Sequence, residues 1–123
     1  MPNELTVSAS ISYRDGNGID GSLQVLDHSV DVASPGMIKQ TYTAPIVDSQ
    51  MFAGGLAGYR WIAIANLDSL NYVQIKPTPG GAYVIKLLAG EVAMFPLDPA
   101  GFTDPYVKAN TAPVDLAFFT VRI

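Results

Sequence analysis

The stretch that decides the fold is Tyr59–Ile75, with the sequence YRWIAIANLDSLNYVQI. It contains an unbroken apolar run (61–65), a polar corner (66–71), and β-prone residues from Tyr72 onward. A short apolar run bounded by turn residues is typical of a strand buried on both faces. The stretch therefore predicts the central hairpin of a β-sandwich, with the only tryptophan, Trp61, in the core.

The N-terminal segment 4–14 has the cleanest strand pattern in the chain. Apolar residues alternate with threonine and serine, and they are Leu5, Val7, Ala9, Ile11 and Tyr13. Such alternation places one face on a core and the other on water or a partner. The hydroxyl face carries no charge, so the strand is poorly guarded against edge pairing, and a neighbouring subunit would remove that hazard.

Further strands are expected along the whole chain, in segments 22–33, 37–44, 82–88, 91–97 and 106–109, and in the last ten residues. The two-residue connection Ala89-Gly90 predicts a tight hairpin, with the glycine supplying a positive φ. Another hairpin is expected around 110–113. The final strand, 114–123, is apolar on both faces, which predicts a central strand or a subunit interface.

About nine to ten short strands with regularly spaced turn signals predict an all-β fold. We expect residues 1–123 to form a single domain, an antiparallel, jelly-roll-like β-sandwich. An immunoglobulin-like sandwich is the alternative, although the chain lacks the Cys-Trp-Cys pattern. Segment 48–58 is ambiguous, since its glycines favour an apolar loop or a single helical turn.

Composition narrows the function classes. The net charge is −4 and the seven basic residues are scattered, which argues against nucleic-acid binding. The chain has no cysteine, so disulfides and thiolate metal sites are excluded. No apolar run is long enough for a membrane helix, and the N-terminus does not resemble a secretory signal. We expect synthesis in a cytoplasm and no membrane partner.

Three groups of residues invite a chemical interpretation, and each has a simpler one. Asp27-His28-Ser29 cannot act as a triad on a strand, where neighbouring side chains point to opposite faces. The loop Asp15–Asp20 resembles the start of a calcium loop but has Ile19 at its fifth position and no glutamate at its twelfth. Asp98 and Asp104 could be the carboxylate pair of a glycosidase. Both lie beside prolines in turns, where aspartate commonly accepts backbone hydrogen bonds. We therefore expect no enzyme, no catalytic residue, no metal and no cofactor.

Aromatic residues are the remaining candidates for ligand contact. Core packing accounts for most of them. Tyr72, Tyr83 and Tyr106 are expected where a polar tip reaches solvent, so they form the predicted ligand surface, for example for a glycan.

The second half of the chain combines several specific features. An apolar strand is followed by an Asn-x-Asp-x-x-Asn-Tyr corner (66–72), then by a Leu-x-x-Gly-Glu turn within 87–95, and finally by the run YVKANTAPVDL (106–116). In this combination, residues 59–123 resemble small virion structural proteins of tailed bacteriophages. The resemblance implies a small β-sandwich that assembles into the particle as a symmetric oligomer, and it implies no catalytic residues.

The expected function is that of a phage capsid decoration, or cement, protein that stabilises the head surface of the virion. Its partners would be copies of itself, with a trimer as one option, and the major capsid protein or other virion proteins. A tail, neck or fibre component with glycan binding is the first alternative, and an independent jelly-roll enzyme or lectin the second. The terminal strands are expected to form the subunit contacts, through Leu5, Val7, Ile11, Tyr13, Leu116, Phe118, Phe119 and Val121.

Overall fold

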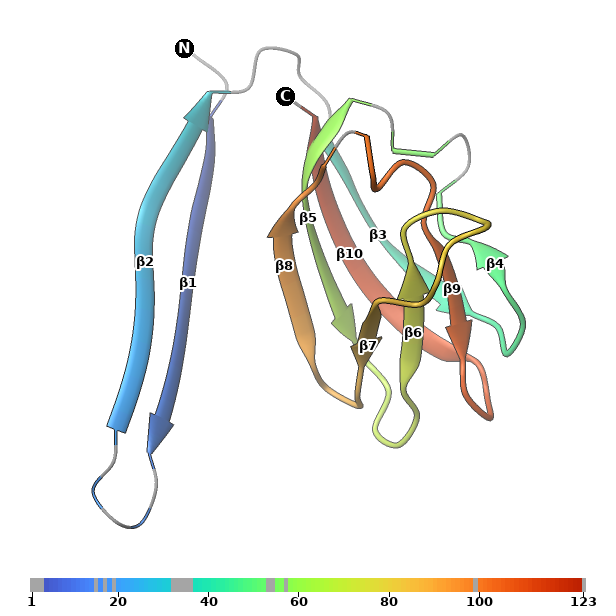
Figure 1. Ribbon diagram of the computed structural model, residues 1–123, viewed down its shortest axis with the longest axis horizontal. Coiled ribbons are helices and arrows are strands. Elements are labelled where there is room, and N and C mark those ends of the chain that lie inside the picture. Colours follow the sequence, from blue (N-terminus) through green and yellow to red (C-terminus); the bar gives the residue numbers. More distant parts are fainter. Residues whose placement is uncertain are drawn as a thin grey trace. The chain divides into compact units, whose positions relative to one another are not determined.

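The computed structural model describes residues 4–14, 16, 18, 20–31, 37–52, 55–56, 58–98 and 100–122. These residues form ten strands (Figure 1). Their bounds are β1 Glu4–Arg14, β2 Asp20–Asp31, β3 Met37–Ala44, β4 Ser49–Gln50, β5 Tyr59–Asn66, β6 Val73–Lys76, β7 Ile85–Leu87, β8 Val92–Pro96, β9 Tyr106–Ala109 and β10 Val114–Arg122. The predicted all-β fold class is confirmed, and the described residues contain no helix long and apolar enough to cross a membrane.

By its internal contacts the chain divides into two compact units, Met1–Pro35 and Gly36–Ile123. The first unit contains the antiparallel pair β1 and β2, which we call the ribbon. Its register shifts between Val7 and Ala9, whose partners on β2 are His28 and Val25. An extra residue in one strand produces such a bulge. The apolar residues of β2 have odd numbers before the bulge, as Leu23 does, and even numbers after it, as Val30 does. The bulge lets both pair with apolar residues of β1, namely Ile11 and Leu5.

The second unit is a sandwich of two antiparallel four-stranded sheets that face each other (Figure 1). The first sheet has the strand order β3-β10-β5-β8, and the second sheet has the order β4-β9-β6-β7. The longest strand of the sandwich, β10, lies between β3 and β5. Its predicted central position is therefore confirmed.

The three hairpins predicted for the second half are instead connections between the two sheets, and this corrects the prediction. β5 lies in the first sheet and β6 in the second, so the corner 67–72 passes between sheets. The same holds for β7 and β8 and for β9 and β10. Gly90 does have a positive φ of 79°, as expected, but the strands on either side of it do not pair with each other. Long-range pairing decides the partner of each strand, and a local turn signal does not reveal it.

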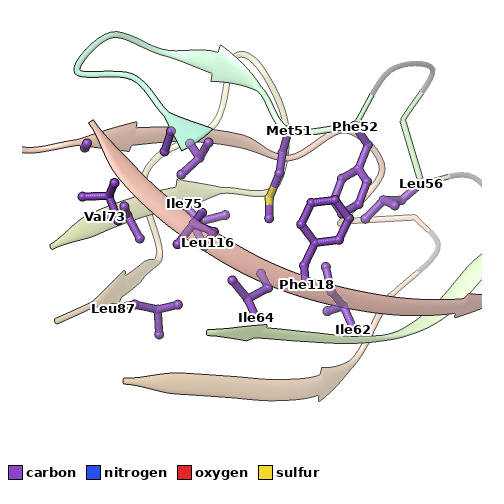
Figure 2. Close-up of a cluster of buried hydrophobic side chains, with 14 of the residues drawn as sticks. Met51, Phe52, Leu56, Ile62, Ile64, Val73, Ile75, Leu87, Leu116 and Phe118 are labelled. Atoms are coloured by element: carbon purple, nitrogen blue, oxygen red, sulfur yellow. The ribbon is translucent and has the colours of Figure 1, made fainter. Parts of the chain in front are cut away.

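The core lies between the two sheets and combines branched aliphatic side chains with an aromatic pair (Figure 2). Ile62, Ile64 and Leu116 from the first sheet meet Val73 and Ile75 from the second. The segment after β4 closes one end of this core. Its described side chains are buried in the cluster, and they are Met51, Phe52 and Leu56. The prediction of an apolar loop for 48–58 is thus confirmed at these positions.

Strand β5 is buried on one face only, which corrects a prediction made from its apolar run. Ile62, Ile64 and Asn66 point into the sandwich and are buried, whereas Trp61, Ala63 and Ala65 alternate with them and are half-buried. Trp61 therefore lies on the outer face of the first sheet and does not belong to the core cluster. Alanine and tryptophan on this outer face made the whole run appear two-sided.

Candidate interaction surface

The outer face of the first sheet consists mainly of apolar side chains. The registers place three rows of four residues on it, and these are Met37–Val121–Trp61–Pro96, Lys39–Phe119–Ala63–Met94 and Thr41–Ala117–Ala65–Val92. Beyond the last row lies the exposed polar pair Thr43–Asp115. Met37, Val92 and Met94 are exposed, and the central residues are half-buried except for the buried Val121. We call these twelve positions the apolar face.

The outer face of the second sheet provides a matched contrast within the same sandwich. Its central row is Lys86–Gln74–Lys108, where both lysines are exposed and carry charge. Solvated charged residues are the ordinary outer surface of a sheet. Only one of the two outer sheet faces in the described sandwich therefore has the composition expected of a buried contact.

The middle of the apolar face is hollow. Three neighbouring alanines, Ala63, Ala65 and Ala117, form its floor, because their methyl groups are short. Phe119 and Val92 border it, and the hollow has a volume of about 470 Å³. Small side chains surrounded by larger ones give a surface into which side chains of a partner can insert.

The ribbon carries the predicted interface residues of the N-terminal strand. Ile11 and Tyr13 are exposed, Leu5 is half-buried and Val7 is buried. Ile11 lies directly opposite Leu23 of β2, and both side chains are about two-thirds exposed, at 69% and 66%. The predicted residues therefore share a strand whose apolar positions are partly open to solvent.

The predicted interface residues of the C-terminal strand divide between its two faces. Phe119 and Val121 lie on the apolar face, in adjacent rows. Leu116 and Phe118 alternate with them and are buried in the core, at 0% and 3% exposure. Their expected place in a subunit contact is corrected, since the opposite sheet already covers them.

Sequence reasoning missed the alanines and the strand β8 as parts of this surface. The sequence pattern places Ala63 and Ala65 in a core run, and Val92 and Met94 in a hairpin that does not form. One signal was present in the sequence. Every second residue from 61 to 65 and from 115 to 121 faces outward, and an alanine at such a position leaves room for a neighbour.

The three tyrosines of the predicted ligand surface are each half-buried beside a lysine. The Lys86 ammonium lies 4.0 Å from the ring centre of Tyr72. Lys76 lies 5.2 Å from the ring centre of Tyr83 and 5.9 Å from that of Tyr106, and it forms an ion pair with Asp48. Cation–π contacts of this kind stabilise the sandwich itself. Glycan binding by these tyrosines stays a prediction.

The polar corner after β5 is a structural joint. The buried Asn66 amide donates to the carbonyl oxygens of Asn71 (2.9 Å) and Leu87 (3.1 Å) and accepts from the Asp68 backbone N–H (2.9 Å). The Asp68 carboxylate accepts from the N–H groups of Asn71 and Leu70, both at 2.7 Å. These hydrogen bonds lower the pKa of Asp68 below its usual value of 3.8, and the bond from the Asn71 N–H has the largest effect. The corner therefore fixes a turn, as its sequence predicts.

The two carboxylates considered for catalysis are hydrogen-bonded within the sandwich. The Asp98 carboxylate accepts from the Ala100 N–H (2.9 Å), and the Asp104 carboxylate accepts from the Gln50 side chain (3.0 Å). No group of three His, Cys, Asp or Glu residues is positioned to hold a metal in this part of the chain. Asp15, Asn17 and Ile19 of the calcium-like loop, and the side chains of Asp27 and His28, lie outside the described residues.

Comparison with known proteins places the fold. No protein-family model matches the chain, and no curated protein sequence does. Among solved structures the chain is similar to one described as "Bacillus endospore appendages form a novel family of disulfide-linked pili". The similarity has a TM-score of 0.52 at 13% sequence identity, and covers 72% of this chain and 85% of the other. At this identity it supports the β-rich sandwich fold alone.

Proposed function

We propose that the protein is a structural subunit that associates with copies of itself through the apolar face. The observation that carries this proposal is the difference between the two outer sheet faces, one apolar and hollow, the other bearing Lys86 and Lys108. Contiguous exposed apolar surface on a sandwich marks an interaction site. Its burial contributes about 25 cal/mol for each Å² removed from water.

Capsid decoration of a phage virion is the specific form of this proposal. Its support is the resemblance of residues 59–123 to phage virion proteins, together with a sandwich that has an apolar face for assembly. A decoration protein adds buried area between capsomers, so we expect many copies on the head and particles less resistant to heat without it. A few copies found only on the tail would instead favour a tail, neck or fibre component.

A filament is a second candidate, because the similar solved structure comes from a protein described as forming disulfide-linked pili. This chain has no cysteine, so a filament of this protein would have to be held by non-covalent contacts. The apolar face offers such contacts. Electron microscopy of the purified protein distinguishes the two assemblies, since filaments would form without any capsid.

The association itself is tested by placing a charge in the hollow. Ala117 lines it, opposite Ala65, so Ala117→Glu would bury a carboxylate in any contact through this face. We expect association to weaken at least about tenfold, which corresponds to about 1.4 kcal/mol. The control is Gln74→Glu on the outer face of the second sheet. Equal association of both variants, measured by light scattering, would refute a role for the apolar face.

A further inference from the structure

The ribbon consists of two strands, and one of its two faces is apolar. Its apolar residues on β1 follow every second position, and the pair Ile11–Leu23 is largely exposed. An isolated two-stranded ribbon is marginally stable in water. The ribbon therefore needs a surface on which to lie.

The distribution of charge disfavours a second ribbon as that surface. Residues 1–35 contain five carboxylates and one arginine, so they carry the whole formal charge of −4. Residues 36–123 contain six residues of each sign. Two ribbons packed together would bring like charges close, which opposes association. The sandwich is neutral, and its apolar face has Lys39 at one side.

The apolar face of the sandwich matches the ribbon in length and in relief. At about 3.4 Å per residue, the eleven residues of β1 extend over roughly 37 Å and the nine of β10 over roughly 31 Å. Ile11 and Leu23 are adjacent large side chains that project from the ribbon. The hollow over Ala65 and Ala117 is the complementary depression.

We propose that the ribbon of one copy lies with its apolar face on the apolar face of a second copy. This inference rests on the proposed self-association and names the two surfaces that meet. The contact joins two different patches, so a reciprocal exchange closes a dimer, and repetition in one direction gives a ring or an open chain. The ribbon thus acts as the linking arm between subunits.

The experiment uses the absence of cysteine from the chain. Two variants are prepared, Ala9→Cys on the apolar side of the ribbon and Ala65→Cys in the hollow, and one of them is labelled with ¹⁵N. They are mixed at a concentration at which the wild-type protein is oligomeric and treated with a short thiol cross-linker. Intact mass then identifies which chains are joined. The matched control is Ser10→Cys, one residue further along β1 and on its hydroxyl side.

The expected product joins one labelled and one unlabelled chain, and forms several-fold less with Ser10→Cys than with Ala9→Cys. Pairs of Ala65→Cys chains would mean that two apolar faces meet, and pairs of Ala9→Cys chains that two ribbons meet. Either result, or an oligomer without any cross-link, overturns the inference and leaves self-association standing. A variant that carries both Ala9→Cys and Ala65→Cys tests for the same contact within one chain. If it stays monomeric and cross-links only within itself, or if the protein is monomeric and does not cross-link, both proposals are overturned.

Discussion

Phe118 and Phe119 are neighbours in the chain, yet they lie on opposite faces of the first sheet. Phe118 is buried and packs edge-to-face on Phe52, with ring centres 4.4 Å apart. Phe119 is half-buried beside Ala63 at the border of the hollow. One strand thus supplies the core with one aromatic residue and the apolar face with the next.

This pair separates folding from association. Phe118→Ala removes a core aromatic ring and is expected to lower the free energy of unfolding by about 3–5 kcal/mol. Phe119→Ala is expected to cost less stability and to weaken association. Chemical denaturation of dilute monomer and light scattering at high concentration measure the two effects. Equal losses of stability in the two variants would contradict the assignment of faces.

The Asn66 side chain holds the corner between the sheets. Asn66→Ala would leave the Asn71 and Leu87 carbonyl oxygens and the Asp68 N–H without this partner. We expect a loss of about 2–4 kcal/mol, since a buried unsatisfied group costs about 1–3 kcal/mol. Leu70→Ala in the same corner is the control, because Leu70 is 86% exposed. A thermal unfolding midpoint of Asn66→Ala equal to that of the control would show that the corner is not a joint.

The Asp68 carboxylate makes the stability of the corner depend on pH. Its pKa is lowered in the folded protein by the N–H groups of Asn71 and Leu70, so the ionised form is favoured there. The stabilisation is complete above the unfolded value of 3.8 and is lost as the pH falls through the lower folded pKa. The stability difference between wild type and Asp68→Asn should therefore narrow below about pH 4. A constant difference from pH 6 to pH 2.5 would contradict this account.

Gly90 needs its positive φ to turn the chain from one sheet to the other. A Cβ there would meet no atom within 4 Å, so Gly90→Ala tests the backbone conformation alone. We expect a loss of about 1–2 kcal/mol from left-handed strain. Gly80 also has open space, and its φ is not in the left-handed region. Gly80→Ala should therefore be neutral or stabilise by up to about 1 kcal/mol. The two unfolding midpoints should move in different directions or by clearly different amounts.

The sequence pattern predicts most strands and the glycine turn because alternation and φ preferences are local properties. It does not reveal that the turns after Asn66 and Leu87 connect different sheets, because strand partners are set by contacts distant in sequence. The pattern also cannot assign Phe118 and Phe119 to their faces. Both faces of β10 are apolar, so only the position of the second sheet shows which aromatic residue is buried.

The central claim is self-association, and the most direct measurement is sedimentation velocity of the unmodified protein over a wide concentration range. The chain has a mass of 13.1 kDa. The account predicts a sedimentation coefficient that rises with concentration toward a defined oligomer or a growing chain. A single 13.1 kDa species at every concentration, including the highest attainable, would contradict it.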